Sequence, residues 1–228
     1  MDIKHVVKET FRHCRSAKGL AIILLPTAFT ALVPVTELST IMRLLYYSIA
    51  VALSVFLWGA ALFYAYAVAQ GRSVTLSNAF GHGAAQFFPL LGTSLLTYLL
   101  VFSGLLLLIL PGLYLSIRLA FAACAATVDD DSPIEALSHS WTLTSRRFWP
   151  VLGAFGVLIL IVFAMAIAIG MVTAIAAIMV PAASGVLIAL ANGSAGLLVS
   201  VFAVLYTVVL YQQLSKRSVE RPVRRPVG

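Results

Sequence analysis

The longest apolar run of the chain, residues 150–180, limits what this sequence can fold into. It contains about 31 residues with Thr173 as its only polar side chain, and as one α-helix it would extend about 46 Å. The hydrocarbon core of a bilayer is about 30 Å thick, so such a run can cross a membrane. The chain is 61% hydrophobic and 10% charged, against about 25% charged in soluble domains. A fold in water could not bury that much apolar surface, and we expect an integral membrane protein.

Polar clusters divide the chain into six predicted membrane-spanning helices, which form one all-α polytopic bundle over residues 1–213. The predicted spans are residues 19–35, 42–69, 88–110, 112–128, 150–176 and 193–211. Pro111 and Gly112 interrupt a run of leucines and predict a tight turn between the third and fourth spans. Because the 150–180 run exceeds one bilayer, we expect it to bend at Gly170 or near Thr173. Residues 176–190 would then lie partly along the outer surface.

Three amphipathic segments are predicted to lie on the cytoplasmic surface of the membrane: residues 1–18, 73–86 and 132–147. In the third, Ser132, Pro133 and Glu135 form a capping box with proline at the first helical position. Its expected apolar face is a stripe with helical spacing: Ile134, Leu137, Trp141, Thr144 and Phe148. Residues 214–228 are basic and rich in proline, and we predict a disordered cytoplasmic tail.

The N-terminus also has the basic start and apolar run of a secretory signal peptide. Pro26 interrupts that run, however, and no small-residue cleavage site follows it. We therefore expect an interfacial helix followed by a first span.

The sequence contains an internal repeat. Residues 87–92 (FFPLLG) match residues 148–153 (FWPVLG), and each block follows a polar helical segment with the pattern Ala-x-x-His. Residues 4–26 form a fainter third copy. The repeating unit is predicted to be an interfacial helix followed by two spans, which does not by itself imply transport.

The basic residues indicate the orientation of the chain. In the six-span arrangement, 13 of the 15 Lys and Arg residues lie on the side of the termini. Because positive charge is retained in the cytoplasm, both termini are predicted to be cytoplasmic, in a bacterial inner membrane. The net charge is +7, but the basic residues stand at span ends and form no groove-sized patch. Anionic lipid headgroups are the expected partners, and nucleic acid is not.

Arg118 is the one basic residue inside a predicted span. An ionisable side chain within the membrane is by default a functional-site hypothesis. Its side chain leans toward the helix N-terminus, so it can snorkel to the surface or bond carbonyl groups at a helix end. The alternative is that it binds a lipid phosphate or another anionic substrate. The predicted spans contain no acidic residue to pair with it.

Three consecutive aspartates, Asp129, Asp130 and Asp131, end the fourth predicted span. Clustered carboxylates suit a hard cation. Adjacent residues do not face one ion without an unusual loop, however, and these carboxylates precede a helix whose dipole they stabilise. His82 and His139 recur at matching repeat positions without metal ligands at the usual spacing. The sequence therefore favours capping and structural or headgroup contacts, and predicts neither a metal site nor a cofactor.

Aromatic and basic residues form a belt at the end of the third amphipathic segment. Its members are Trp141, Arg146, Arg147, Phe148 and Trp149. Such a belt is typical of an interface with anionic lipid. It is equally suited to docking a cytoplasmic or membrane protein. Expected partners besides lipid are therefore another membrane protein or, in a homo-oligomer, a second copy of the chain.

One stretch resembles a known family. It combines residues 110–115 (LPGLYL) with Arg118, Ser132-Pro133, Ala136-Leu137, Ser140-Trp141 and residues 147–149 (RFW). This pattern is similar to the membrane domain of glycerophosphoryl diester phosphodiesterases and of related bacterial integral membrane proteins. In those phosphodiesterases a separate soluble barrel domain performs catalysis, and this chain has none. The resemblance thus implies a membrane module without phosphodiesterase activity.

Three function classes remain open. The first is a non-enzymatic scaffold or lipid-interacting membrane module, which the sequence favours because it shows no nucleophile elbow or acid–base constellation. The second is a small transporter or channel for a lipid or anionic substrate. The third, a lipid-modifying enzyme, needs polar groups that meet at one depth in the membrane, and the sequence assembles none.

Overall fold

The computed structural model describes residues 3–14, 19–23, 39–145, 147–179 and 184–219, and these residues form helices and short connections without a strand. In chain order the helices are α1 (Ile3–Cys14), α3 (Thr40–Ala69), α4 (Leu76–Ala85), α5 (Phe87–Leu107), α6 (Ile109–Arg118), α7 (Ala122–Val128), α8 (Pro133–Ser145), α9 (Phe148–Met179) and α10 (Ser184–Val219). Residues 19–23 are also helical. The predicted all-α fold is confirmed.

Five segments of the described chain are long and apolar enough to cross a membrane: Thr40–Ala69, Phe87–Leu107, Ile109–Val128, Phe148–Ile175 and Gly193–Lys216. The predicted first span, residues 19–35, lies mostly outside the described residues. The chain is therefore a multi-pass membrane protein by the length and composition of its helices.

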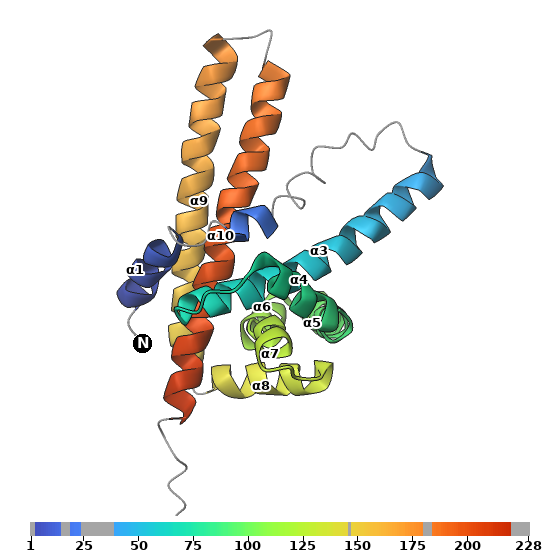
Figure 1. The fold of residues 1–228 in the computed structure, drawn as a ribbon, viewed down its shortest axis with the longest axis vertical. Helices are drawn as coiled ribbons and strands as arrows, with labels where there is room; N and C mark the ends of the chain where they lie inside the picture. The colour runs from blue at the N-terminus through green and yellow to red at the C-terminus, as the bar shows by residue number, and fades with distance from the viewer. Residues whose placement is uncertain (1–2, 15–18, 24–38, 146, 180–183, 220–228) are drawn as a thin grey trace, which may run out of the picture.

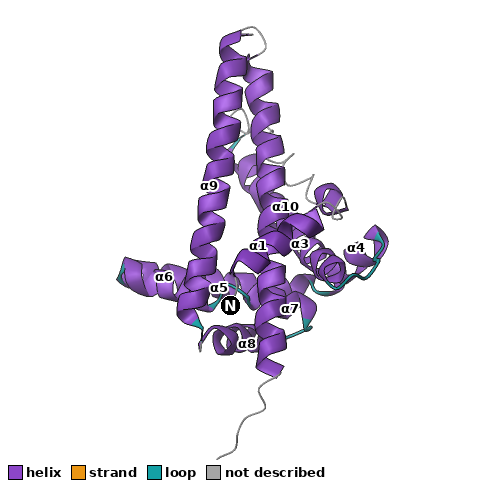
Figure 2. Cartoon of the chain, turned by 90° about the vertical axis from the view of Figure 1, so that its left-hand side faces the viewer, coloured by secondary structure: helices purple, strands orange, loops and turns teal. Residues whose placement is uncertain are grey.

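Two helical hairpins dominate the shape. α9 and α10 run side by side over most of their length in both views (Figures 1 and 2). α5 and α6 pack against each other and run across the lower part of that hairpin in Figure 2. The outward sides of α5 and α9 expose large apolar residues such as Leu106 and Ile159, as expected of helices surrounded by lipid.

The core forms around the second half of α10. Tyr206, Leu210 and Tyr211 are almost fully buried there, against Ala61 and Ala65 of α3. Small residues on α3 allow the two helix backbones to approach closely. α1 packs on the same helix through Phe11, whose ring centre lies 5.2 Å from that of Phe202. α10 thus connects the N-terminal helix with the elements that carry the candidate site.

The predicted turn at Pro111-Gly112 is wrong. The chain reverses at Leu108, which has an extended backbone, and α6 already includes Pro111 and Gly112 in its first turn. Proline is tolerated in that turn because an amide at this position has no partner within the helix. Gly112 is required for packing: a Cβ there would lie 2.7 Å from the Leu105 backbone nitrogen of α5. Gly112 therefore allows the two hairpin helices to approach closely just after the turn.

The fourth predicted span, residues 112–128, is not one continuous helix. α6 ends at Arg118, three residues form turns, and α7 begins at Ala122. The break is possible because side chains of α8 replace the missing helical hydrogen bonds, as described below.

α9 and α10, in contrast, are longer continuous helices than the sequence predicts. α9 continues without a break through Gly170, and Thr173 returns its hydroxyl to the carbonyls of Ile169 and Gly170 in the same helix. The expected surface segment 176–190 instead forms the end of α9 and the start of α10 around residues 180–183, which are not described. α10 also extends to Val219, so residues 214–219 of the predicted disordered tail are helical, and 220–228 lie outside the described residues.

The three predicted amphipathic segments correspond to α1, α4 and α8, and the predicted apolar stripe of α8 is only partly buried within the protein. Ile134 is 76% exposed and Trp141 is 40% exposed, although both belong to the predicted apolar stripe. The buried residues are Ala136, Ser140, Leu143 and Thr144. α8 packs against α7, and the side with these four residues faces the protein, while Ile134 is exposed.

Candidate functional site

The candidate site is built around the break between α6 and α7. Ser140 Oγ donates a hydrogen bond of 2.8 Å to the Arg118 carbonyl and accepts one of 3.1 Å from the Phe121 amide. Thr144 Oγ1 also lies 3.2 Å from the Arg118 carbonyl. Unpaired backbone groups cost free energy away from water, and these two hydroxyls satisfy the groups that the break releases.

Arg118 closes α6 and is enclosed by aromatic rings. Its side chain turns back one helical turn, so that Nε and Nη2 donate to the Tyr114 hydroxyl at 2.9 and 2.6 Å. The guanidinium carbon lies 4.9 Å from the ring centres of Tyr114 and Trp141 and 5.9 Å from that of Phe148. These distances fit cation–π contacts. We call Arg118 with Tyr114, Trp141 and Phe148 the Arg118 enclosure.

The charge in the enclosure is not neutralised within the described part of the chain. Arg118 is 9% exposed, forms no ion pair with a described carboxylate, and its Nη1 is buried without a hydrogen-bond partner. Arginine stays protonated in proteins, so this is a buried cation with unused donors. A cation held in this way attracts an oxyanion, to which guanidinium donates two parallel hydrogen bonds. The sequence suggested that Arg118 bonds carbonyl groups at a helix end. In the structure its side chain bonds the Tyr114 hydroxyl instead.

The predicted aromatic and basic belt is divided between the enclosure and the surface. Trp141 and Phe148 contact Arg118, whereas Trp149 is 77% exposed. Arg147 is half-buried, and Arg146 lies outside the described residues. The sequence indicated these residues as a group but not the contact of two of them with Arg118.

The cap of α8 contains the carboxylate contact of a capping box. The Ser132 amide donates to Glu135 Oε2 at 3.1 Å, with Pro133 at the first helical position. Hydrogen bonds from the Ser132 side chain and amide lower the pKa of Glu135 below its usual value. These contacts fix the start of α8. They therefore also help to position Ser140 and Thr144 beside the break between α6 and α7.

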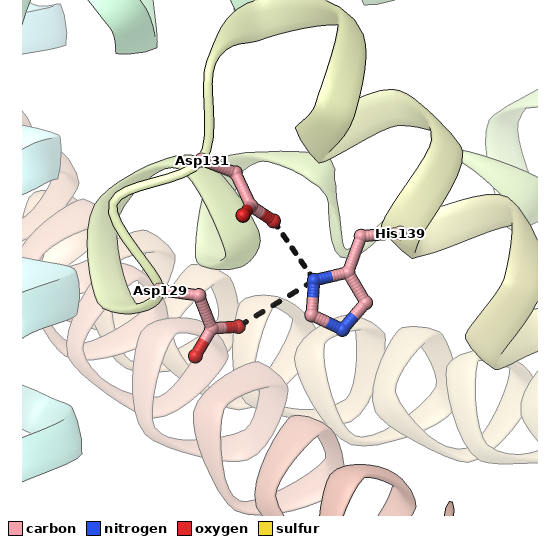
Figure 3. A group of neighbouring side chains, drawn as sticks. All are labelled: Asp129, Asp131 and His139. Atoms are coloured by element: carbon pink, nitrogen blue, oxygen red, sulfur yellow. Dashed lines mark hydrogen bonds and ion pairs between the residues drawn. The ribbon is translucent and has the colours of Figure 1, made fainter.

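The aspartates and His139 form a second cluster at the junction of α7 and α8. Figure 3 shows Asp129 and Asp131 on the connecting loop, both directed toward His139 of α8. His139 Nδ1 lies 2.8 Å from Asp131 Oδ2 and 3.7 Å from Asp129 Oδ2, and Tyr211 of α10 donates to Asp129. One ligand atom from each of the three residues lies within 4.8 Å of the others, so this set could hold a metal ion. Each side chain already has a protein partner.

The loop conformation explains why the spacing of residues in the sequence did not predict this cluster. Asp130 has a positive φ of 57°, which turns its side chain away, toward His82 of α4 and Gln86, the residue that follows α4. Asp129 and Asp131 therefore do share one side, contrary to the expectation for adjacent residues. The recurrence of histidine in the repeat was the available signal: His82 Nε2 lies 2.6 Å from the Thr127 carbonyl, so both histidines contact the end of α7 or its loop.

These helices and this enclosure define a multi-pass α-helical membrane protein with an interrupted helix at a buried arginine. The chain belongs to a family described as a domain of unknown function, DUF7847, whose model matches residues 30–214. The match includes α3 to α9 and most of α10, and therefore the whole Arg118 enclosure. No curated protein matches the chain. No solved structure matches it either.

Proposed function

We propose that the protein is a lipid-interacting membrane module whose Arg118 enclosure binds the phosphate of an anionic lipid. The observation that carries this proposal is the buried guanidinium, which has no described carboxylate partner and leaves Nη1 without an acceptor. A phosphate oxygen is the acceptor that membrane surroundings supply, and it would neutralise the charge. The exposed Trp149 and half-buried Arg147 next to the enclosure in sequence suit the headgroup region.

The proposed role is binding and not catalysis. The two hydroxyls that contact the Arg118 carbonyl, Ser140 and Thr144, are both engaged in backbone hydrogen bonds. Neither has the adjacent general base that activates a nucleophile in the described part of the chain. The Asp129, Asp131 and His139 cluster supports a structural role, because its members pair with one another and with Tyr211.

A second candidate, transport of a lipid or anionic substrate, is favoured by one observation. The α6–α7 helix is interrupted beside a buried cation, and interrupted helices form the substrate sites of many transporters. Substrate-dependent flux into proteoliposomes that disappears in Arg118→Leu would support transport. Lipid binding without such flux would support the binding module.

The test of lipid binding is native mass spectrometry of the protein titrated with phosphatidylglycerol or phosphatidylethanolamine. We expect the wild type to retain phosphatidylglycerol preferentially, Arg118→Leu to lose that preference, and Arg118→Lys to keep part of it, because lysine retains the charge without the planar donors. Arg72→Leu is the matched control, since Arg72 is exposed in the α3–α4 connection. Equal retention by wild type and Arg118→Leu would refute the proposal.

The orientation and location of the chain belong to the same proposal. Both termini would be cytoplasmic in a bacterial inner membrane, supported by the 13 of 15 basic residues on the terminal side of six spans. A C-terminal fusion to a reporter that fluoresces only in the cytoplasm tests this, and a dark fusion protein present at normal levels would contradict it.

We also propose a distant relation to the membrane domain of glycerophosphoryl diester phosphodiesterases. The supporting observation is that residues of the shared pattern gather at one place: Tyr114, Trp141 and Phe148 all contact Arg118. A structure of such a membrane domain with an arginine in an equivalent aromatic enclosure would support the relation. An unrelated helix order there would refute it.

A further inference from the structure

A cavity lies on α3, α5, α6 and α7, apart from the Arg118 enclosure. Its volume is about 480 Å³, within the range of about 300–1,000 Å³ that small-molecule sites occupy. Ser116, Leu119 and Ala120 line it from α6 and the α6–α7 break, whereas the Arg118 guanidinium packs on Tyr114, Trp141 and Phe148. The cavity therefore belongs to a different set of side chains from the proposed phosphate site.

The wall of the cavity is uncharged and rich in hydroxyl groups. Six of its lining residues carry a hydroxyl: Ser54, Thr93, Ser94, Thr97, Tyr98 and Ser116. The other lining residues are apolar, among them Trp58, Leu90 and Val101, and none is ionisable at neutral pH. A surface that met only lipid chains would be expected to be apolar, because polar groups in a membrane are unfavourable unless they have partners.

The hydrogen bonds of these hydroxyls define what the cavity offers to a ligand. Ser54, Thr93 and Ser116 donate their protons to carbonyls of their own helices, at 2.7 to 2.8 Å. The Ser54 and Ser116 oxygens each keep a lone pair that can accept another hydrogen bond, whereas Thr93 is fully buried. Thr97 Oγ1 is buried without a hydrogen-bond partner. It is one of two such side-chain atoms in the described residues, the other being Arg118 Nη1. The cavity therefore presents acceptors and one unsatisfied hydroxyl.

The cavity opens toward the lipid-facing side of α5. Tyr98 lines it and is 74% exposed, next to the exposed Leu95 and Leu99 on the same helix. A ligand would thus enter from the bilayer and needs an apolar body. Its polar part should be uncharged and carry a hydroxyl, because a hydroxyl can both donate to Thr97 Oγ1 and accept from it.

We propose that this cavity binds an uncharged, hydroxyl-bearing lipid of the diacylglycerol type, with its hydroxyl directed to the Thr97 side of the wall and a chain along Trp58, Leu90 and Val101. The proposal goes beyond phosphate binding at Arg118 and does not depend on it. The hydroxyl of such a lipid can form hydrogen bonds with the hydroxyl-rich wall and with the unpaired Thr97 oxygen, whereas the acyl chains of bulk phospholipid cannot.

Photo-crosslinking in nanodiscs tests this with two matched probes: a photoactivatable diacylglycerol and its O-methyl ether, which lacks the hydroxyl donor. For the wild type we expect the hydroxyl probe to label cavity residues about three- to tenfold more than the ether at equal concentration, the effect of one net hydrogen bond. Thr97→Val, similar in shape, should remove the difference between the probes. Ser94→Phe should fill the cavity and abolish labelling by both.

Thr207→Val is the matched control, because Thr207 lies on α10 and bonds the carbonyl of Ala203 in its own helix. It should label like the wild type. Monodisperse elution and an unchanged unfolding midpoint identify folded variants, and Thr97→Ser serves as a second variant that keeps the hydroxyl and the preference. Equal labelling of the wild type by the two probes would overturn the proposal and identify the occupant as a lipid chain only.

Discussion

At the residue scale, Ser140 is the side chain on which the interrupted helix depends most directly. Its hydroxyl bonds both the Arg118 carbonyl and the Phe121 amide, and it is fully buried. Ser140→Ala would leave the Phe121 amide unsatisfied, while Thr144 still reaches the Arg118 carbonyl at 3.2 Å. We expect a loss of about 2 kcal/mol in the free energy of unfolding, measured by steric trapping in bicelles.

Ser145→Ala is the control for this prediction. Ser145 is exposed and bonds only the carbonyl of Thr142 within α8. Its substitution should change the free energy of unfolding by less than about 0.5 kcal/mol. Equal losses in the two variants would contradict the role assigned to Ser140.

Glu135 gives a prediction about pH. Because hydrogen bonds from Ser132 lower the pKa of Glu135 in the folded protein, its contribution to the α8 cap is complete above the usual value of 4.5. That contribution is lost as the pH falls through the lower, folded-state value. A carboxyl ¹³C titration by NMR should report a midpoint below 4.5 in the wild type and a return toward it in Ser132→Ala. A wild-type midpoint at or above 4.5 would contradict the capping box.

The residues of the site differ in how far sequence could predict them. Arg118 stands out as the charge in an apolar run, and Tyr114 at four residues' distance is a partner that helix geometry allows. The sequence indicates Trp141 and Phe148 as aromatic anchors, but their contact with Arg118 depends on how α8 packs beside α7. No local spacing contains that information.

At the element scale, the α5–α6 hairpin depends on close contact at Gly104 and Gly112. A Cβ on Gly112 would lie 2.4 Å from the Leu105 side chain and 2.7 Å from its backbone nitrogen, so it could be accommodated only if the two helices moved apart. We predict that Gly112→Ala destabilises the protein by about 1–3 kcal/mol, measured by the same unfolding assay.

Gly156→Ala is the matched control for the hairpin. Gly156 lies within α9, and a Cβ there would meet nothing within 4 Å. This substitution should be neutral or stabilise α9 by up to about 1 kcal/mol, since alanine is the better helix former. A Gly112→Ala variant as stable as Gly156→Ala would show that the hairpin is not closely packed.

Element boundaries were predictable where polar residues mark them and not where packing decides them. Thr75 and Ser132 begin α4 and α8 near the predicted positions because their caps are local. The break after Arg118 could not be predicted, since the hydroxyls that support it come from α8. Gly170 and Thr173 suggested a bend, but a helix surrounded by apolar contacts keeps its backbone bonds.

At the scale of the whole molecule, Tyr211 connects the central helix α10 to the α7–α8 loop. It is buried and donates to Asp129, which in turn lies 3.7 Å from His139. Hydrogen bonds to charged groups contribute about 1.5–3 kcal/mol, so Tyr211→Phe should lower the free energy of unfolding by about 2 kcal/mol. Tyr47→Phe, at an exposed position of α3, should have little effect. If the two variants are equally stable, this contact does not hold the elements together.

The class of the molecule followed from its hydropathy, because no soluble fold can bury runs of this length. The arrangement of the hairpins did not, because lipid-facing and protein-facing surfaces of a membrane helix are both apolar. For the same reason the central position of α10 has no signature that distinguishes it from α9. Contacts between helices, and therefore the enclosure of Arg118, required the structure.

Phosphate binding at Arg118 is most directly tested by solid-state NMR of the protein with ¹⁵N-labelled arginine in bilayers that contain phosphatidylglycerol. Dipolar dephasing of guanidinium nitrogen by lipid ³¹P reports a direct contact. We predict a dephased signal in the wild type that is missing in Arg118→Lys and persists in Arg72→Leu. Identical dephasing in the wild type and Arg118→Lys would mean that no lipid phosphate contacts Arg118, and the proposed function would be wrong.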